Sequence, residues 1–337
     1  MPVCVTGATG FLATHVVRAF LEAGDTVHGT VRSLGNEPVL APLREAAAAH
    51  ASRLELFEAD LVKPEGSGFA DALRGCDVLV HTATPVVVDT SEMADADAER
   101  AFTEPAVAGT EALLAAAKAA QVRHVVLTAS TGCMLGRPAF DEPRAPSELS
   151  ADVVSDLPWM RENKQWYRLA KTLQEAAARE FCAANGMSIS TLHPSLILGP
   201  YFGDASTRLS IGHEMAEAWL RDAGTVVPNG HTGVVDVRQV ASAHVAAAAR
   251  LREGHAGGRY LLNQNPLWHQ EDFAKALHDS AGRPMELALE PESERGYRAV
   301  PPTADVRPAA DDLGIVLRAP EDVVAATVAS LRAHARL

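Results

Sequence analysis

A tyrosine and a lysine four residues apart, Tyr167 and Lys171, are well suited to move a proton. Residues 163–185 contain few helix breakers and end at Asn185-Gly186, which predicts one helix. At this spacing the two side chains share a helix face and lie about 6 Å apart along the axis. An isolated phenol has a pKa of about 10, and a nearby ammonium lowers it toward the working range of an acid or base. We expect Tyr167 to transfer the proton and Lys171 to lower the pKa of Tyr167.

A third group can hold the oxygen that receives this proton. Residues 124–128 are strongly apolar and predict a buried strand, and Ser130 follows its end, where open parallel sheets bind their ligands. The hydroxyl of Ser130 can donate to a carbonyl oxygen and stabilise developing negative charge. Alone, a serine at this position is an ordinary turn residue. Together with Tyr167 and Lys171 it predicts a catalytic site.

The beginning of the chain is suited to bind a pyrophosphate. Residues 2–6 predict a buried strand and residues 10–23 an amphipathic helix, so that Gly7 and Gly10 fall in the turn between them. A side chain at Gly7 would obstruct the turn, and one at Gly10 would keep a diphosphate from the helix N–H groups. Ala13 allows the helix to pack closely on the strand. An ordinary connection is the alternative, but this position in an α/β pattern favours a nicotinamide dinucleotide.

The second predicted strand, residues 26–31, ends at Arg32. Folds that select NAD place an Asp or Glu in this region to bind the ribose hydroxyls. A guanidinium can instead stack on adenine and bind a ribose 2′-phosphate through charge-assisted hydrogen bonds. We therefore expect NADP(H) as the cofactor in preference to NAD(H). The alternative is that Arg32 is a solvated residue at a strand end.

Strands and helices alternate along the first 200 residues. This pattern predicts an α/β fold, a Rossmann-type doubly wound parallel sheet. The predicted strands are 2–6, 26–31, 54–58, 77–82, 124–128 and 188–192. We expect residues 1–200 to form an NADP-binding domain to which 236–251 returns as a helix. Residues 201–235 and 255–337 are expected to form a smaller C-terminal substrate-binding lobe.

Composition limits the partners. The 337 residues are 47% hydrophobic, enough for a large core, and carry a formal net charge of −13, which disfavours nucleic acid and anionic membranes. We expect no signal peptide and no membrane span, because no apolar run reaches about 18 residues. The four cysteines lack CxxC spacing and are expected to be free thiols in a reducing cytoplasm. The histidines show no metal-binding spacing, so we expect no metal.

Several motifs resemble the extended branch of the short-chain dehydrogenase/reductase superfamily. They are TGATGFLA at 6–13, Asp60-Leu61, GCDVLVHTATP at 75–85, Ser130, Tyr167 with Lys171, HPSLILGP at 193–200 and VVDVRQVASAH at 234–244. Within this branch the chain is similar to the dihydroflavonol reductase and cinnamoyl-CoA reductase group, with yeast-type ketone reductases as relatives. HTATP, Arg32 and KQWYRLAK, which is close to the plant reductases' KNWYCYGK, carry this second resemblance.

The resemblance implies further cofactor contacts. Asp60 and Leu61 would contact adenine, residues 81–84 would line the adenosine and nicotinamide-ribose side, and residues 194–197 would flank the nicotinamide. The expected cofactor-binding residues are Gly7, Thr9, Gly10, Phe11, Leu12, Arg32, Asp60, Leu61, Thr82, Ala83, Thr84, Tyr167, Lys171, Pro194, Leu196 and Ile197. The chain departs from the plant reductases at Ala129, where they usually have a serine. It also lacks the basic residue that follows Arg32 by seven positions in dihydroflavonol reductases, which weakens the expected NADP preference.

The expected reaction is reversible hydride transfer to the carbonyl of an apolar or aromatic ketone or aldehyde. The loop 85–97, residues 131–165 and the start of the second lobe should roof the pocket, with a lining expected from Met134, Trp159, Trp166, Tyr201, Phe202 and Trp219. Alternatives within the fold are a hydroxysteroid dehydrogenase and a sugar-nucleotide epimerase, and an alternative from another class is a non-catalytic NADP-binding redox sensor. Such relatives are monomers or homodimers.

Overall fold

The computed structural model describes residues 1–63, 68–84, 92–136, 148–221, 226–285, 287–289 and 301–337. Its centre is a sheet of seven parallel strands. Their order in the sheet is β12 (Arg259–Leu262), β7 (Ser188–Pro194), β5 (His124–Thr128), β4 (Val78–His81), β1 (Val3–Val5), β2 (Val27–Val31) and β3 (Leu54–Glu58). The order reverses beside β1, so the carboxyl ends of β1 and β4 open a crevice of the kind that binds ligands in doubly wound sheets.

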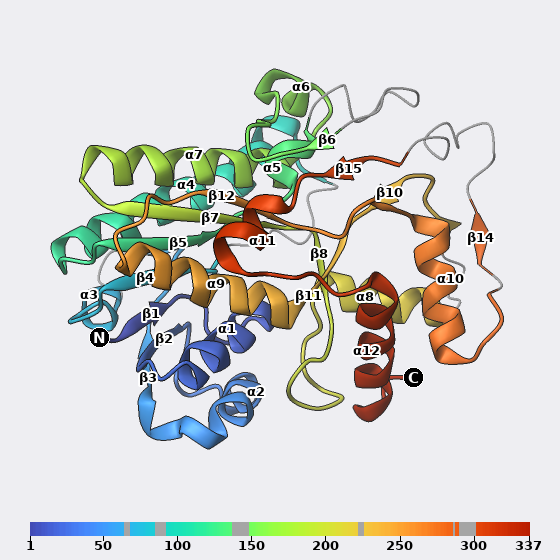
Figure 1. Cartoon of the computed structure of the whole chain (residues 1–337), viewed down its shortest axis with the longest axis horizontal. Helices are drawn as coiled ribbons and strands as arrows, with labels where there is room; N and C mark the ends of the chain where they lie inside the picture. Colours follow the sequence, from blue (N-terminus) through green and yellow to red (C-terminus); the bar gives the residue numbers. More distant parts are fainter. Residues whose placement is uncertain (64–67, 85–91, 137–147, 222–225, 286, 290–300) are drawn as a thin grey trace.

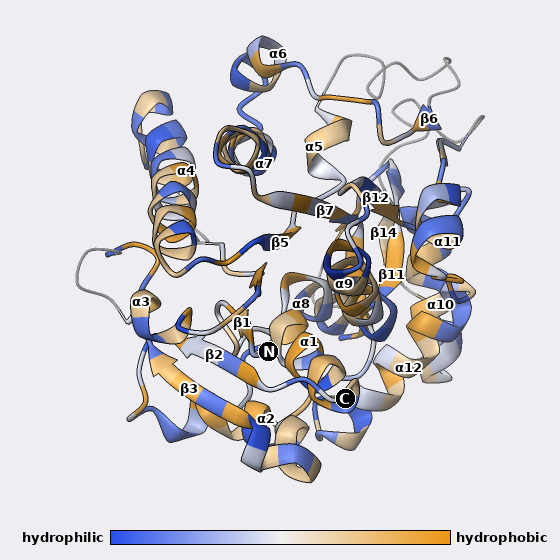
Figure 2. Cartoon of the chain, turned by 60° about the vertical axis from the view of Figure 1, so that its left-hand side comes forward, coloured by the Kyte–Doolittle hydropathy of each residue, from blue (hydrophilic) through white to orange (hydrophobic). Residues whose placement is uncertain are grey.

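The sheet is buried because helices cover both of its faces (Figure 1). One face carries α3 (Phe69–Ala72), α4 (Asp95–Ala119), α5 (Gly132–Leu135), α6 (Leu157–Glu162) and α7 (Trp166–Ala184). The other face carries α1 (Phe11–Glu22), α2 (Glu37–Ala47), the 3₁₀ helix η1 (Ala48–Arg53) and α9 (Val237–Arg252). Figure 2 shows α7 and α9 end-on, on opposite sides of the sheet. Continuous apolar strands and amphipathic helices are the sequence cause of this layering.

A second group of elements packs beside the carboxyl edge of the sheet. It contains α8 (Ile211–Leu220), α10 (Gln270–Ala281) and α12 (Pro320–Ala333), which share an apolar cluster. Four short strand pairs accompany them: β8 (Leu196–Leu198) with β11 (Val234–Asp236), β10 (His231–Thr232) with β13 (Trp268–His269), β9 (Val226–Val227) with β14 (Ala288–Leu289), and β6 (Glu148–Leu149) with β15 (Thr303–Ala304). Phe11, at the start of α1, joins this cluster from the main domain.

The six predicted strands of the main sheet are confirmed, and the edge strand β12 was not predicted. Residues 259–262 were assigned to the smaller lobe, but they pair with β7 in the main sheet. Helix α11 (Arg307–Leu313) was also assigned to that lobe, whereas Ala309, Leu313 and Ile315 pack in the core of the main domain. The chain therefore returns to the sheet after α9, and the boundary predicted at residue 255 is wrong for these two segments.

Candidate active site

Ser130, Tyr167 and Lys171 meet at the carboxyl edge of the sheet. Ser130 lies two residues beyond β5, and Tyr167 lies in the first turn of α7. The hydroxyl of Ser130 interacts with the phenol of Tyr167 and also accepts a hydrogen bond from the N–H of Gly132 at 3.0 Å. Tyr167 is 46% exposed, whereas Lys171, one turn further along, is only 3% exposed. Part of the Tyr167 side chain is therefore accessible, although its surroundings desolvate the hydroxyl, whereas Lys171 is buried.

Three hydrogen bonds hold the ammonium of Lys171. Its Nζ donates to Thr84 Oγ1 at 3.0 Å, to the carbonyl oxygen of Thr128 at 2.7 Å and to Gln174 Oε1 at 2.8 Å. These partners come from the end of β4, the end of β5 and α7 itself, so the lysine ties the three elements together. Burial lowers the pKa of Lys171 to about 8, although nearby Cys133 and Glu175 act in the opposite direction.

The expected effect of Lys171 on Tyr167 is not what the structure shows. Burial raises the pKa of Tyr167 above its ordinary value, and the interaction with Ser130 reduces that rise. The three hydrogen bonds of the Lys171 ammonium go to other oxygens, and the net shift of the Tyr167 pKa is upward. The prediction that Lys171 lowers the pKa of Tyr167 is therefore wrong for this arrangement. A raised pKa keeps the phenol protonated at neutral pH, which suits a proton donor.

The turn between β1 and α1 has the geometry that its glycines predict. Gly7 adopts φ +64°, which favours glycine, and a Cβ there would lie 3.1 Å from Ala83 Cβ. Gly10 precedes α1 with an ordinary φ of −71°, and a Cβ there would lie 3.3 Å from the carbonyl oxygen of Gly7. Ala13 is buried in the contact between the helix and the sheet. The backbone of this turn can thus approach a ligand closely.

A buried network fixes the β4 end against the β1 end. Thr6 Oγ1 accepts hydrogen bonds from the N–H groups of Thr82 at 3.2 Å and Ala83 at 3.1 Å, and it bonds His81 Nδ1 at 2.9 Å. Thr82, Ala83 and Thr84 are half-buried, so this expected cofactor wall lies beside the glycine turn. Burial lowers the pKa of His81 to about 3, with a further contribution from Lys171. His81 is therefore neutral at physiological pH.

The adenine end of the expected cofactor site is partly formed by exposed groups. Arg32 follows β2 and is exposed, and no ion-pair partner for it occurs among the residues that the structure describes. Asp60 is half-buried and its Oδ1 accepts a hydrogen bond from the N–H of Val62 at 3.0 Å. Leu61 is buried against α4, where a Cβ at Gly109 would lie 2.7 Å from its carbonyl oxygen. Arg32 and Asp60 are thus among the polar groups available at this edge.

The segment after β7 lies across the carboxyl edge from the glycine turn. The carbonyl oxygen of Pro194 accepts a hydrogen bond from the N–H of Thr131 at 3.1 Å, which holds it beside Ser130. Leu196 and Ile197 belong to β8 and are half-buried. These residues were expected to flank the nicotinamide, and the structure places their segment next to the triad.

Three of the expected pocket residues are core residues instead. Met134 is fully buried in a cluster with Leu149 and Leu261, and Tyr201 and Trp219 lie in the apolar core of the second lobe. Tyr201 stacks on His334 at 4.2 Å between ring centroids. Large apolar side chains satisfy a core and a pocket equally well, so their sequence pattern does not separate the two.

The remaining pocket candidates are half-buried. Trp159 lies on α6 and Trp166 begins α7 next to Tyr167. Phe202 packs against α1, with its ring centroid 4.8 Å from that of His15 and the guanidinium of Arg18 over it. Much of the expected pocket roof, residues 85–91 and 137–147, lies outside the described residues. Trp159 and Trp166 thus remain the pocket candidates on the side of Tyr167.

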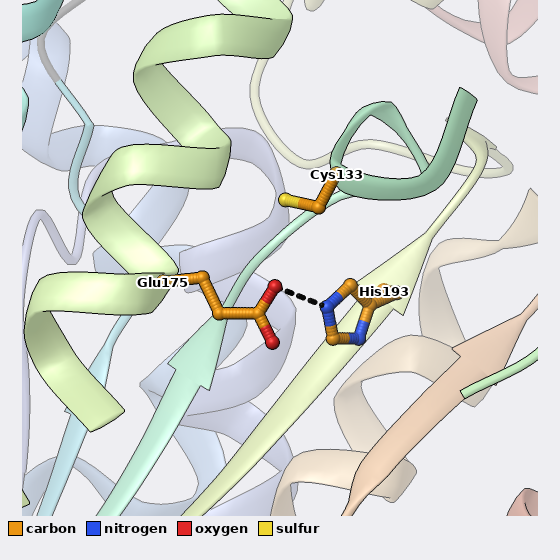
Figure 3. Close-up of side chains that lie close together, drawn as sticks. All are labelled: Cys133, Glu175 and His193. Carbon is orange, nitrogen blue, oxygen red and sulfur yellow. Dashed lines mark hydrogen bonds and ion pairs between the residues drawn. The ribbon is translucent and has the colours of Figure 1, made fainter. Parts of the chain in front are cut away.

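A cluster of Cys133, Glu175 and His193 lies behind the triad (Figure 3). All three are buried, and one potential ligand atom from each lies within 4.8 Å of the others. However, Glu175 accepts from Arg259 through both oxygens, at 2.7 and 3.0 Å, and from His193 Nε2 at 3.0 Å. A cation bound here would face the guanidinium of Arg259, so we interpret the cluster as a buried ion-pair network.

The other expectations from composition concern thiols and membrane spans. Cys4, Cys76, Cys133 and Cys182 are free and buried, and burial raises the pKa of each. Among the described residues, no helix has the length and apolar character required to cross a bilayer. The thiols are thus packed as small hydrophobic groups, protonated at neutral pH.

Comparison with known proteins agrees with this geometry. Residues 3–262 match the NAD dependent epimerase/dehydratase family. The chain is 34% identical over 277 residues to cinnamoyl-CoA reductase 1 of Petunia hybrida, covering 82% of this chain and 76% of the relative. It is 35% identical over 288 residues to tetraketide alpha-pyrone reductase 1 of Arabidopsis thaliana, covering 82% and 81%.

Solved structures share the fold. The NADPH complex of the yeast methylglyoxal/isovaleraldehyde reductase Gre2 superposes with a TM-score of 0.82 at 22% identity, covering all of both chains. The NADPH complex of Gre2 from Candida albicans gives a TM-score of 0.81 at 24% identity, covering 99% of each chain. The chain therefore belongs to the NAD dependent epimerase/dehydratase family and is an oxidoreductase of its extended short-chain dehydrogenase/reductase branch.

Proposed function

We propose that this protein is an NADPH-dependent reductase of an apolar or aromatic ketone or aldehyde, with Ser130, Tyr167 and Lys171 as its catalytic residues. The observation that carries the proposal is the partly exposed Tyr167 whose phenol interacts with the Ser130 hydroxyl, with the buried Lys171 one turn further along α7. This arrangement can bind a carbonyl oxygen and deliver a proton to it from one side.

The residues around the glycine turn fit a dinucleotide. The backbone at Gly7 forms a surface that a Cβ would fill, next to Ala83 and the half-buried Thr82 and Thr84. Gly7, Thr9, Gly10, Phe11 and Leu12 would hold the pyrophosphate, with the other cofactor residues expected from the sequence on either side. When bound, the reduced cofactor supplies hydride for the carbonyl carbon. Both Gre2 structures are NADPH complexes, which supports NADP(H) here.

The protein side chains perform the proton chemistry. The Ser130 hydroxyl donates a hydrogen bond to the carbonyl oxygen and stabilises the charge that develops as hydride arrives at carbon. The phenol of Tyr167 then gives its proton to that oxygen and becomes a phenolate. The ammonium of Lys171 would have to exchange one of its present acceptors to bond the nicotinamide ribose or to stabilise this phenolate. Oxidation of the alcohol uses the same groups in reverse and is favoured at higher pH.

Other functions are less well supported. In sugar-nucleotide dehydratases of this fold an acidic pair stands beside the catalytic Ser or Thr, whereas Ser130 is followed by Thr131 and Gly132. A hydroxysteroid dehydrogenase would differ chiefly in pocket shape. A redox sensor needs neither an exposed Tyr167 nor a buried Lys171, and the chain retains both. The buried free thiols fit a cytoplasmic protein.

A substrate panel tests the proposed activity. The panel contains aryl ketones, aliphatic ketones, keto-esters and acyl-CoAs. We expect the NADPH absorbance to fall with the aryl or apolar ketones or aldehydes. Acyl-CoAs are included because several relatives are named cinnamoyl-CoA reductases, although the net charge of −13 disfavours so anionic a substrate. NADPH binding without turnover of any class would favour the sensor, and interconversion of nucleotide sugars would favour an epimerase.

Arg32 should determine the choice of cofactor. Because its exposed guanidinium can form charge-assisted hydrogen bonds with the 2′-phosphate, Arg32→Ala should raise the KM for NADPH by about 10- to 100-fold and that for NADH by less than about threefold. Initial rates with each cofactor measure both values. Arg74→Ala removes another exposed arginine, paired with Asp71, and should change neither. Equal losses for the two cofactors in Arg32→Ala would mean that Arg32 does not bind the phosphate.

A further inference from the structure

Gln174 is a fully buried amide whose hydrogen bonds reach from the candidate catalytic lysine to the strand ends beside the glycine turn. Its Oε1 accepts a hydrogen bond from Lys171 Nζ at 2.8 Å, and its Nε2 donates to Thr110 Oγ1 on α4 at 2.9 Å. Thr110 Oγ1 also lies 3.0 Å from His81 Nε2, and His81 Nδ1 lies 2.9 Å from Thr6 Oγ1. Thr110 and Thr6 are fully buried, and His81 is 1% exposed.

The shorter bonds of this network fit one direction, in which the nitrogens of Gln174 and His81 that lie 3.4 Å apart both donate to Thr110 Oγ1 rather than to each other. Thr6 Oγ1 already accepts two backbone N–H groups, so its own proton goes to His81 Nδ1. His81 is neutral and therefore carries its proton on Nε2, which donates to Thr110 Oγ1. The ammonium of Lys171 has only donors, so the oxygen of the Gln174 amide must face it. The amide cannot reverse without losing both of its strongest bonds.

Helix spacing places Gln174 on the same face of α7 as the two catalytic residues. Tyr167, Lys171 and Gln174 are separated by four and three residues and share one face of α7. A glutamine in this buried stripe requires desolvation of an amide, a cost that only its hydrogen bonds offset. The acceptors that hold Lys171 from the neighbouring strands are Thr84 Oγ1 and the carbonyl oxygen of Thr128, so Gln174 is the acceptor supplied by its own helix.

We propose that Gln174 is a positioning residue for the reductase reaction: its amide oxygen holds the ammonium of Lys171 in place from within α7 and stabilises its charged form. The inference rests on the proposed function, because it acts through Lys171. A carbonyl dipole directed at a buried ammonium favours the protonated state. Without this acceptor, Lys171 would keep its bonds to Thr84 and Thr128 but lose one of the three that orient it and favour its charged form.

Other groups around Lys171 must be held constant in a test. Glu175 acts on it from α7, Cys133 from α5 and His81 from β4, and Tyr167 lies one turn before it on α7. Cys133 and Tyr167 are protonated and His81 is neutral at pH 7, while Glu175 is ionised and paired with Arg259. None of them changes charge between about pH 6 and pH 9, so among these described groups Lys171 is the one that titrates there.

Two substitutions with opposite electrostatic effects provide the test. Gln174→Met preserves length and removes the acceptor, so the pKa of Lys171 should fall and the alkaline limb of kcat should move about one unit lower in pH. Gln174→Glu keeps an acceptor and adds negative charge, so the limb should move about one unit higher. We expect kcat of Gln174→Met at neutral pH to fall by about tenfold with little change in KM. The measurement is kcat against pH at saturating NADPH and ketone.

A purely structural role would not give shifts of opposite sign. Thermal unfolding of each variant shows whether it is folded, and Gln239→Met, the same change on α9, should leave the pH profile unchanged. If both Gln174 variants keep the wild-type limb, or move it in one direction, the inference is wrong. If Gln174→Met does not fold, the upward shift in Gln174→Glu decides alone. If Lys171→Ala retains full turnover, the proposed function itself fails, which separates the two conclusions.

Discussion

Tyr167→Phe should lower kcat for carbonyl reduction by about 10²- to 10⁴-fold, because it removes the proton donor and leaves the ring in place. The Kd for NADPH should remain close to that of the wild type, since the Tyr167 hydroxyl is one of many contacts expected for the cofactor. The raised pKa of Tyr167 keeps that proton bound at neutral pH, so the loss should be seen across the range in which the wild type is active. Steady-state kinetics and fluorescence titration with NADPH measure the two quantities.

The same hydroxyl deletion elsewhere is the control. Tyr260 lies on the edge strand β12, and its hydroxyl donates a hydrogen bond to Asp312 at 3.3 Å. The Tyr260→Phe variant should keep nearly full turnover. Because Tyr167 is 46% exposed, its substitution should change the free energy of unfolding by less than about 0.5 kcal/mol. Near-native kcat in a folded Tyr167→Phe enzyme would remove the tyrosine from the mechanism. Loss of NADPH binding would assign it to the cofactor site instead.

Much of the fold follows from local patterns in the chain. A parallel strand with helices on both faces buries both of its own faces, so segments such as 124–128 are apolar without alternation and can be located from the sequence. Strand β12 could not be located this way. Its sequence RYLL is short, begins with an arginine and follows the mixed region after α9, and only pairing with β7 makes it part of the sheet. Tertiary contact, not local preference, decides this strand.

In the candidate site, too, local sequence patterns predict one part and tertiary contacts decide the other. The spacing of Tyr167 and Lys171 fixes a shared helix face, and the structure places them together with Ser130. The spacing does not fix what the ammonium bonds. Thr84, Thr128 and Gln174 come from three elements, and only their assembly shows that Lys171 is held by them rather than by Tyr167. A glutamine three residues after Lys171 on the buried stripe of α7 was the available signal for this network.

The ion-pair network behind the triad should have the largest effect on stability. Glu175 bonds Arg259 and His193, and Arg259 also donates to the carbonyl oxygens of Ala151 and Val153. The network therefore joins α7, β7 and β12 to the segment before α6. Glu175→Met leaves the guanidinium of Arg259, whose side chain is only 13% exposed, without its carboxylate and should lower the free energy of unfolding by about 3–5 kcal/mol. Arg259→Met should cost a similar amount, measured by denaturant unfolding at pH 7.

Two comparisons separate loss of the pair from loss of a single charge. The double variant Glu175→Met with Arg259→Met should be more stable than either single variant, because no buried charge remains unpaired. Glu22→Gln breaks the exposed pair with Arg18, whose side chains are 51% and 47% exposed, and should cost less than about 0.5 kcal/mol. Additive losses in the double variant would show that Glu175 and Arg259 act independently.

The contribution of the Glu175–Arg259 pair to the free energy of unfolding should depend on pH with a definite sign. Burial alone would raise the pKa of Glu175, but hydrogen bonds from His193 and Arg259 and the charge of Arg259 outweigh it and hold this pKa well below its usual range. Burial lowers the pKa of His193, so at neutral pH Arg259 supplies the positive charge. A depressed carboxyl pKa stabilises the fold fully above the unfolded value of about 4.3, and this contribution is lost as the pH falls further. The stability difference between wild type and Glu175→Met should therefore be constant near neutrality and shrink below about pH 4, and a difference that grows with acid would contradict the ionised pair.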